Sequence, residues 1–252
     1  MQNEIKKKLA EIETSENVKV LYAAESGSRA WGFASPDSDY DVRFIYVRPA
    51  ADYLRLEKTR DVIEWQLDAV YDINGWDLRK TLQLLHKSNP TLFEWGNSPL
   101  VYRSSEIWEK LHGVFDRYFL DRAGMWHYLS MARTNYREYL HGDTVPLKKY
   151  LYVLRPLFAC RWILMHHCPP PMRFAELADA IADPAIMPAV RALTAQKMQS
   201  PELGCGAKIP VLNAYIERSI PELLAAVHAL PAESGRDWSE LNAMFAAALS
   251  AE

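Results

Sequence analysis

The sequence has few of the features that mark secreted or membrane proteins. Its 252 residues include only three cysteines, with no C-x-x-C spacing, so we expect reduced thiols and no disulfide framework. The N-terminus has no apolar signal segment. The longest apolar run, residues 150–165, is too short to span a bilayer and is broken by Arg155, Pro156 and Arg161. These absences predict a cytoplasmic protein that does not associate with membranes.

The sequence also lacks an excess of positive charge. Its net charge is −3, which leaves no global basic field for coating nucleic acid or a membrane surface, although a local basic patch is still possible. Hydrophobic residues make up 49% and charged residues 24%, the balance of a globular protein. The length permits one large domain or two small ones.

The first part of the chain mixes helix and strand patterns. Apolar residues at helical spacing predict an amphipathic helix over residues 3–13. Short apolar, partly β-branched segments at 18–26 and 41–47 predict buried strands, and 62–73 predicts one long strand or a hairpin. From Gly75 the apolar spacing becomes helical.

Beyond residue 110 the strand signals nearly vanish. Helical periodicity continues over residues 106–141, 146–167, 174–199, 208–229 and 238–250. We therefore predict an α+β protein, with a mixed sheet and flanking helices in a domain over 1–110 and an all-helical domain over 111–252.

The most informative stretch is residues 27–44, GSRAWGFASPDSDYDVRF. Gly27-Ser28 ends a predicted strand and begins a short helical turn, where exposed backbone N–H groups and a small residue suit a phosphate. The Ser28 hydroxyl adds a donor, and Arg29 adds a positive charge beside it or pairs with a nearby aspartate.

A pair of carboxylates follows in the same stretch. Asp39 and Asp41 are two residues apart at the start of the second strand, so their side chains are expected on one face of the sheet. Two carboxylates so placed can share a hard divalent cation such as Mg²⁺. Each motif alone is more often an ordinary surface turn; their combination in this order is more restrictive.

This combination resembles the signature of the DNA polymerase β-type nucleotidyltransferase superfamily. More narrowly, GSRAWGFASPDSDYDVRFIY, DINGWDLRK and KSNPTLFEW resemble the predicted-nucleotidyltransferase family typified by YcgL, some of whose members are described as RNA-ligase-associated polymerases of RNA repair. The resemblance is strongest over residues 18–103 and extends to KKYLYVLRPLFACRWI in the helical half. It implies the nucleotidyltransferase fold and Mg²⁺-dependent transfer of a nucleoside monophosphate from an NTP.

The resemblance also implies roles for particular residues. Asp39 and Asp41 match the paired metal ligands and catalytic acids, and the Gly27-Ser28 pair matches the triphosphate-binding turn. DINGWDLRK places the third carboxylate at Asp72, where an acid at the end of an apolar segment would need a cation. Glu64, in a similar apolar run, is the alternative.

The implied cofactor is a pair of Mg²⁺ ions, about 3.5–4 Å apart as in other two-metal sites. Asp39, Asp41 and Asp72 would share one ion and Asp39 and Asp41 the other. In the helical half, Lys149 is the residue expected to reach the nucleotide phosphates. Trp31, inside the GS motif, is a candidate for nucleotide contact.

The identity of the acceptor is left open by the sequence. By family analogy we expect an RNA 3′ end. The alternatives are a hydroxyl of a protein or small molecule, or a non-catalytic nucleotide-binding module of the toxin–antitoxin type.

Overall fold

The computed structural model describes residues 1–199, 204–232 and 236–250. These residues form two compact units. The first unit comprises residues 1–27, 39–118 and the C-terminal stretch 236–250; the second comprises 28–38 and the residues from 119 to 232, apart from 200–203. None of the helices in the described part of the chain has the length and apolar character needed to cross a membrane.

The first unit is built on a five-stranded sheet with the strand order β3-β4-β2-β1-β5. Only the β2–β4 pair is parallel among these neighbours, so the sheet is mixed. The elements of this unit are α1 (Gln2–Glu16), β1 (Lys19–Glu25), β2 (Tyr40–Val47), α3 (Ala50–Tyr53), β3 (Val62–Leu67), β4 (Tyr71–Asp77), α4 (Leu78–His86), α5 (Pro90–Gly96), β5 (Val101–Ser104), α6 (Glu106–His112), the 3-10 helix η1 (Phe115–Tyr118) and α12 (Ser239–Ser250).

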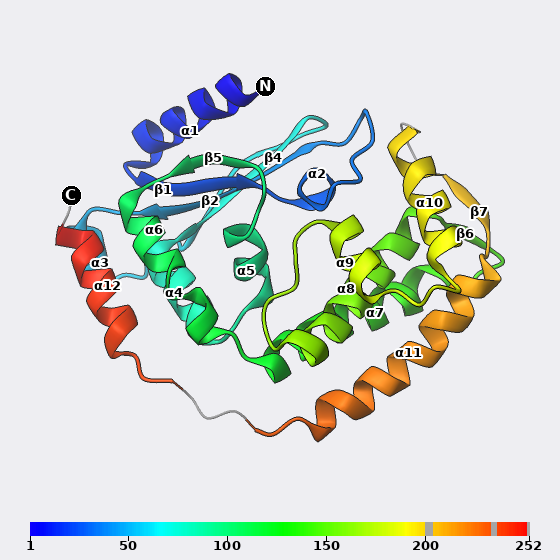
Figure 1. Ribbon diagram of the computed structural model, residues 1–252. Coiled ribbons are helices and arrows are strands. Elements are labelled where there is room, and N and C mark those ends of the chain that lie inside the picture. The colour runs from blue at the N-terminus through cyan, green and yellow to red at the C-terminus, as the bar shows by residue number, and fades with distance from the viewer. Residues whose placement is uncertain (200–203, 233–235, 251–252) are drawn as a thin grey trace. The chain divides into compact units, whose positions relative to one another are not determined.

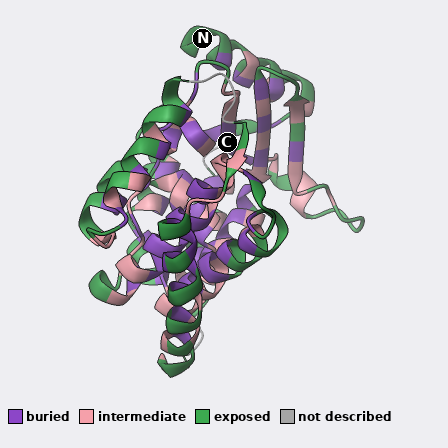
Figure 2. Ribbon diagram, turned by 90° about the vertical axis from the view of Figure 1, so that its right-hand side faces the viewer, coloured by how far each residue is buried: buried purple, intermediate pink, exposed green. Residues whose placement is uncertain are grey.

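The two faces of this sheet are covered differently. Helix α1 lies on one face, and α4 and α5 lie on the other (Figure 1). The α1 side is a continuous apolar core, in which Ile5, Leu9 and Ile12 pack with Val42 and Phe44 of β2. Along the strands, buried residues alternate with partly exposed ones near the ends where β2 and β4 begin (Figure 2). Polar side chains at those ends therefore lie on the face away from α1.

The second unit is largely helical. It contains α7 (Asp121–Tyr139), α8 (Lys148–His166), α9 (Phe174–Ile181), α10 (Met187–Gln199) and α11 (Pro210–Ala229). The short helix α2 (Gly27–Trp31) begins on the last residue of the first unit's N-terminal segment and continues in the second unit. Helix α8 is buried over its middle turns, where every residue from Val153 to Cys160 is buried, which makes it the centre of this unit's core.

The predicted α+β class is confirmed, and two details differ. The helical half also holds a two-stranded sheet, β6 (Thr144–Pro146) with β7 (Cys205–Ala207), so it is largely rather than entirely helical. Of the two alternatives expected for residues 62–73, the structure has the hairpin, formed by β3 and β4. Strand β4 continues through Gly75, where a Cβ atom would lie 2.3 Å from the Phe44 ring; the helix starts only at Leu78, capped by the Asp77 side chain.

The units also group differently from the predicted domains 1–110 and 111–252. Residues 28–38 belong with the helices because Trp31 and Phe33 pack there, with Phe33 edge-on to Phe174 of α9 at 5.5 Å. The C-terminal helix belongs with the sheet, where Trp238 stacks on His86 of α4 at 3.6 Å. Aromatic contacts between residues far apart in sequence decide both assignments, and local periodicity carries no information about them.

Candidate active site

Two predicted acids meet at one end of the five-stranded sheet. Strands β2 and β4 are parallel and start at the same end, with Asp41 directly opposite Asp72. Residues in register on neighbouring strands point to the same face. Both carboxylates therefore lie on the face away from α1, and both are only partly exposed, at 19% and 26% of the side-chain surface.

A single guanidinium group joins the two carboxylates. Arg43 Nη2 donates to Asp41 Oδ1 at 2.8 Å and to Asp72 Oδ2 at 2.6 Å. Arg43 Nη1 donates to the main-chain carbonyl of Asp72 at 2.7 Å. Arg43 was not among the predicted site residues, although its position two residues after Asp41 places it on the same face of β2.

The glycine of the GS motif lies against one of these acids. Gly27 has a φ of +57°, and a Cβ atom added there would lie 1.9 Å from Asp41 Oδ2. Ser26 N also donates to the main-chain oxygen of Asp41 at 2.8 Å, so the β1–β2 pairing continues to the turn. The turn after β1 and the acid on β2 are thus in direct contact, and only glycine satisfies both the backbone angle and the space.

A buried glutamate holds the start of β2 in place. Glu25, the last residue of β1, is fully buried, and its Oε1 accepts from the backbone N–H of Asp41 at 2.9 Å. Its other carboxylate oxygen accepts from the Tyr102 hydroxyl. Glu25 was missed because a charged residue at the end of an apolar strand looks like the start of a loop.

The other two predicted acids lie in different surroundings. Asp39 is one residue before β2 and is half-buried. Glu64, the alternative third acid, lies on the edge strand β3 with 74% of its side chain exposed, and pairs with Arg60 at 2.6 Å. The structure therefore brings Asp72, and not Glu64, to Asp41. Among the described residues, no three His, Cys, Asp or Glu side chains form a ready-made metal site.

The second unit gathers hydroxyl and cationic groups in segment 28–38. Ser28 Oγ donates to Ser38 Oγ at 3.1 Å, and Ser35 Oγ is 3.0 Å from Ser38 Oγ. Arg29 Nη2 donates to the main-chain oxygen of Ser38 at 2.5 Å. Lys197 of α10, which is buried, donates to Ser35 Oγ at 2.5 Å. Lys197 had no motif around it in the sequence, and only the fold reveals it.

Lys149 lies beside aromatic rings of the same unit. Its Nζ is 3.8 Å from the Tyr139 ring centroid and 5.4 Å from that of Tyr152, and Tyr152 packs edge-on to Trp31 at 5.5 Å. Burial lowers the pKa of the Lys149 ammonium group, and the charge of the preceding lysine lowers it further. Trp31 is packed against the Arg155 guanidinium at 4.7 Å, so Arg155 obtains a cation–π partner.

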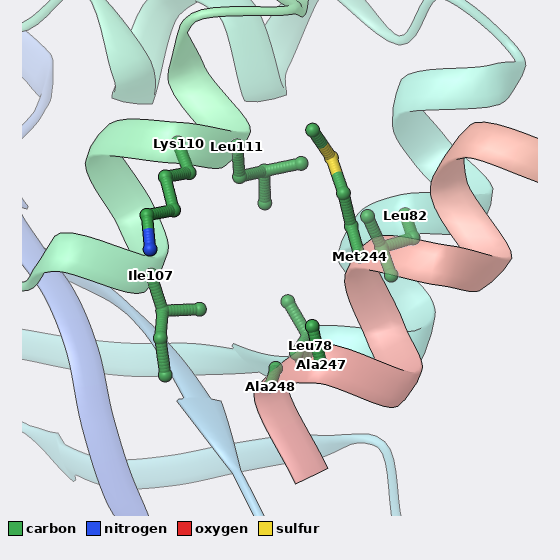
Figure 3. A pocket seen from close by; sticks show the side chains of 8 residues that line it. All are labelled: Leu78, Leu82, Ile107, Lys110, Leu111, Met244, Ala247 and Ala248. Carbon is green, nitrogen blue, oxygen red and sulfur yellow. The ribbon is translucent and has the colours of Figure 1, made fainter. Parts of the chain in front are cut away.

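An apolar cavity of about 130 Å³ in the first unit is separate from these groups. It lies between helices α4, α6 and α12, and Figure 3 shows side chains from all three around it. Its lining is aliphatic apart from Lys110. None of the predicted site residues lines it, and its lining offers neither a nucleophile nor a pair of acids, so we do not assign the chemistry to it.

Comparison with known proteins gives a family. A model of the RNA repair pathway DNA polymerase beta family matches residues 1–247. An uncharacterized protein of Bacillus subtilis (strain 168), YcgL, is 45% identical over 244 residues, which cover 96% of this chain and 94% of that protein. These matches confirm the resemblance drawn from the sequence motifs.

A nucleotidyltransferase-like protein from Exiguobacterium sibiricum 255-15 aligns with 91% of this chain and 75% of its own, with 12% identity and a TM-score of 0.33. A likeness of this size does not establish a shared fold, so the family assignment depends on the sequence matches.

Proposed function

The chain belongs to the RNA repair pathway DNA polymerase beta family, and we propose that it is a Mg²⁺-dependent nucleotidyltransferase. It transfers a nucleoside monophosphate from an NTP to a hydroxyl acceptor and releases pyrophosphate. The acceptor that we propose is an RNA 3′ end, because the family model is named for RNA repair and a polymerase extends such an end.

The observation that carries this proposal is the convergence of Asp41 and Asp72 on one cationic nitrogen beside Gly27. Carboxylate oxygens from two strands lie 2.6 and 2.8 Å from Arg43 Nη2. A shared cation between two acids is the charge arrangement that a metal-dependent phosphoryl-transfer site needs. The Gly27 backbone against Asp41 leaves no side chain between the turn and the acid.

The donor set fits Mg²⁺. Hard divalent ions prefer carboxylate oxygens, and Asp41 and Asp72 supply them from adjacent strands. We assign Asp39, Asp41 and Asp72 as the residues that would hold the two ions. When bound, the ions would neutralise the triphosphate and lower the pKa of the acceptor hydroxyl.

The triphosphate itself would be bound by the groups around segment 28–38. Ser28 directly follows Gly27, the glycine that lies against Asp41. The proposed phosphate-binding turn is therefore next to that glycine in the sequence. We assign Ser28, Arg29 and Lys149 to the phosphates, and we add Lys197, which is bonded to the same serine network. Hydrogen bonds from charged donors to phosphate are stronger than those between neutral groups.

In the reaction, the acceptor oxygen forms a bond to the α-phosphorus while the bond from that phosphorus to the bridging oxygen breaks. Pyrophosphate leaves with the bonding electron pair, and the acceptor proton passes to Asp72 or to water. The protein contributes positioning and charge neutralisation, as is general for phosphoryl transfer.

The test is a labelling experiment with the full chain. Each of the four α-³²P-labelled NTPs is incubated with Mg²⁺ and a short RNA bearing a 3′-hydroxyl, and pyrophosphate release is followed in parallel. We expect a labelled RNA one or more nucleotides longer, with stoichiometric pyrophosphate. The same RNA with a blocked 3′ end should remain unlabelled.

Two variants act as controls. Asp41→Asn should abolish transfer while the thermal unfolding transition stays cooperative, whereas Asp116→Asn, which changes an exposed acid of η1, should leave the rate unchanged. Label on the protein instead of the RNA would show that the acceptor is a protein hydroxyl and not an RNA 3′ end. NTP binding without pyrophosphate release would favour a non-catalytic nucleotide-binding module, and full activity of Asp41→Asn would refute the site.

A further inference from the structure

Arg43 lies between the two acids that are proposed to bind metal. Its Nη2 carries two hydrogens, and the distances of 2.8 Å to Asp41 and 2.6 Å to Asp72 use one for each carboxylate. Its side chain is only 13% exposed, so this is not a loose surface pair. Its Nη1 bond of 2.7 Å to the Asp72 main-chain oxygen fixes the guanidinium from a second direction.

The position of Nη2 is incompatible with a metal ion bridging the same oxygens. Mg²⁺ binds carboxylate oxygens at about 2.0–2.1 Å, closer than either of the two Arg43 hydrogen bonds. A metal ion held by the same two carboxylate oxygens would need the space between them that Nη2 occupies. The guanidinium group has to leave before the acids can share a metal.

Charge leads to the same conclusion. Two half-buried carboxylates held in register repel each other unless a cation lies between them. One guanidinium supplies that cation, and a divalent ion supplies twice its charge. Both cations would use the same oxygens of Asp41 and Asp72, so the two cations compete.

We propose that Arg43 is an internal substitute for the divalent cation, which holds Asp41 and Asp72 together in the metal-free protein and is displaced when metal binds. This inference rests on the metal site of the proposed function and adds a regulatory step to it. The displaced guanidinium group keeps its charge, and the Nη1 bond to a main-chain oxygen gives it a pivot at the edge of the site. Arg43 is thus a positioning residue that sets the metal affinity of the resting protein.

The test measures Mn²⁺ binding to the protein alone, by the electron paramagnetic resonance signal of free Mn²⁺, without nucleotide. Arg43→Met removes the charge and keeps most of the length. We expect its Kd for Mn²⁺ to be at least tenfold lower than that of the natural sequence, which corresponds to about 1.4 kcal/mol. Arg43→Lys keeps a charge but loses the planar guanidinium group, so its Kd for Mn²⁺ should lie between those of Arg43→Met and the natural sequence.

The matched control is Arg103→Met. Arg103 is also a strand arginine of the first unit that pairs with a carboxylate, at 2.6 Å from Glu13, but it lies on β5 away from the acid pair. Its removal should leave the Mn²⁺ affinity unchanged. A lower Kd in both variants would show only a general effect of net charge and would overturn the proposal.

Thermal unfolding gives a second readout that a purely structural role would not reproduce. Without metal, Arg43→Met should have a lower Tm because the carboxylates repel, and saturating Mn²⁺ should raise its Tm by more than it raises that of the natural sequence. An equal loss of Tm with and without Mn²⁺, together with an unchanged or higher Kd, would show that Arg43 only braces the sheet.

The failure of this inference differs from failure of the proposed function. If the natural sequence and Arg43→Met bind Mn²⁺ with the same affinity, and Asp41→Asn abolishes that binding, the metal site stands and displacement of Arg43 is refuted. If none of these proteins binds Mn²⁺, including Arg43→Met, the metal site itself is refuted and the inference with it.

Discussion

The two units carry opposite chemistry at the places where the chain passes between them. In the first unit the groups are acidic: Asp41 and Asp72 share one arginine, and Glu25 accepts from the Asp41 backbone. In the second unit, segment 28–38 and α10 together carry hydroxyls and cations: Ser28, Ser35, Ser38, Arg29 and Lys197. Carboxylates suit a hard metal ion, and hydroxyls with ammonium and guanidinium groups suit phosphate.

This difference separates two tasks that a nucleotidyltransferase must perform. One region would hold metal and the other triphosphate. A net charge of −3 hides this separation, because the average over the whole chain cancels local excesses. If the division is correct, substitutions in the two regions should change different measured quantities.

After the loss of transfer expected for Asp41→Asn, the largest effect is expected at the third acid. Asp72→Asn should lower kcat by about 10²–10³-fold, the size of loss typical when one charge-stabilising group of a preorganised site is removed. Glu64→Gln, which changes an exposed acid on the neighbouring strand, should leave kcat unchanged. Single-turnover kinetics at saturating NTP measures both. If Glu64→Gln lowered kcat more than Asp72→Asn did, Glu64 would be the third carboxylate.

The glycine turn tests the contact between β1 and β2. Gly27→Ala combines a strained φ of +57° with a Cβ atom 1.9 Å from Asp41 Oδ2, so it should lower both Tm and activity. Gly32→Ala is the matched control, because Gly32 has a φ of +85° but no neighbouring atom within 4 Å. The control isolates the backbone strain, about 1–3 kcal/mol.

Gly27→Ala should therefore cost more stability than Gly32→Ala, and it should also lower kcat by displacing Asp41. Equal losses for the two alanine variants, measured by chemical denaturation, would mean that Asp41 moves aside freely. In that case the turn would not determine the position of the acid.

The cationic region should respond in nucleotide affinity rather than in metal affinity. Lys197→Met removes the ammonium bonded to Ser35, and we expect the Kd for NTP to rise about tenfold. Lys208→Met, elsewhere in the same unit, should leave the Kd unchanged. Calorimetry measures the Kd for NTP, and titration of the same variants with Mn²⁺ measures their metal affinity. If Lys197→Met changed only the Mn²⁺ affinity, the assignment of triphosphate binding to this region would be wrong.

The smallest effect concerns pH. Because burial lowers the pKa of Lys149, its charge is lost at a lower pH than for an ordinary lysine. If Lys149 binds phosphate, NTP affinity should decline as the pH rises through this lowered pKa and be restored as the pH falls. Lys149→Arg, which stays protonated, should bind NTP without this decline. A decline of equal size in Lys149→Arg would assign the titration to another group.

Much of the fold was readable from local patterns. The strands around residues 18–26 and 41–47 and the helices of the C-terminal half follow from apolar spacing, because each buries one face or one stripe. Asn89 before Pro90 marks the start of α5, and its side chain accepts from Thr91 N. The start of α4 was placed too early because a glycine inside a strand, forced by the Phe44 ring, resembles a helix boundary.

The site was readable only in part, for a definite reason. Asp39, Asp41 and the GS turn are close in sequence, so their spacing alone indicates a shared site. Asp72 needed the family resemblance, because the parallel pairing that sets it opposite Asp41 is a long-range contact. Lys197 and Ser35 are 162 residues apart, and no local pattern links them.

The sequence by itself determined the order of strand, turn and acid pair and the number of charges available to the site, since these depend on neighbouring residues. Only the tertiary structure decided that Arg43 lies between Asp41 and Asp72 and that Gly27 touches Asp41. Strand register and side-chain packing set those positions. They are properties of the assembled sheet, in which residues distant along the chain come within hydrogen-bonding distance.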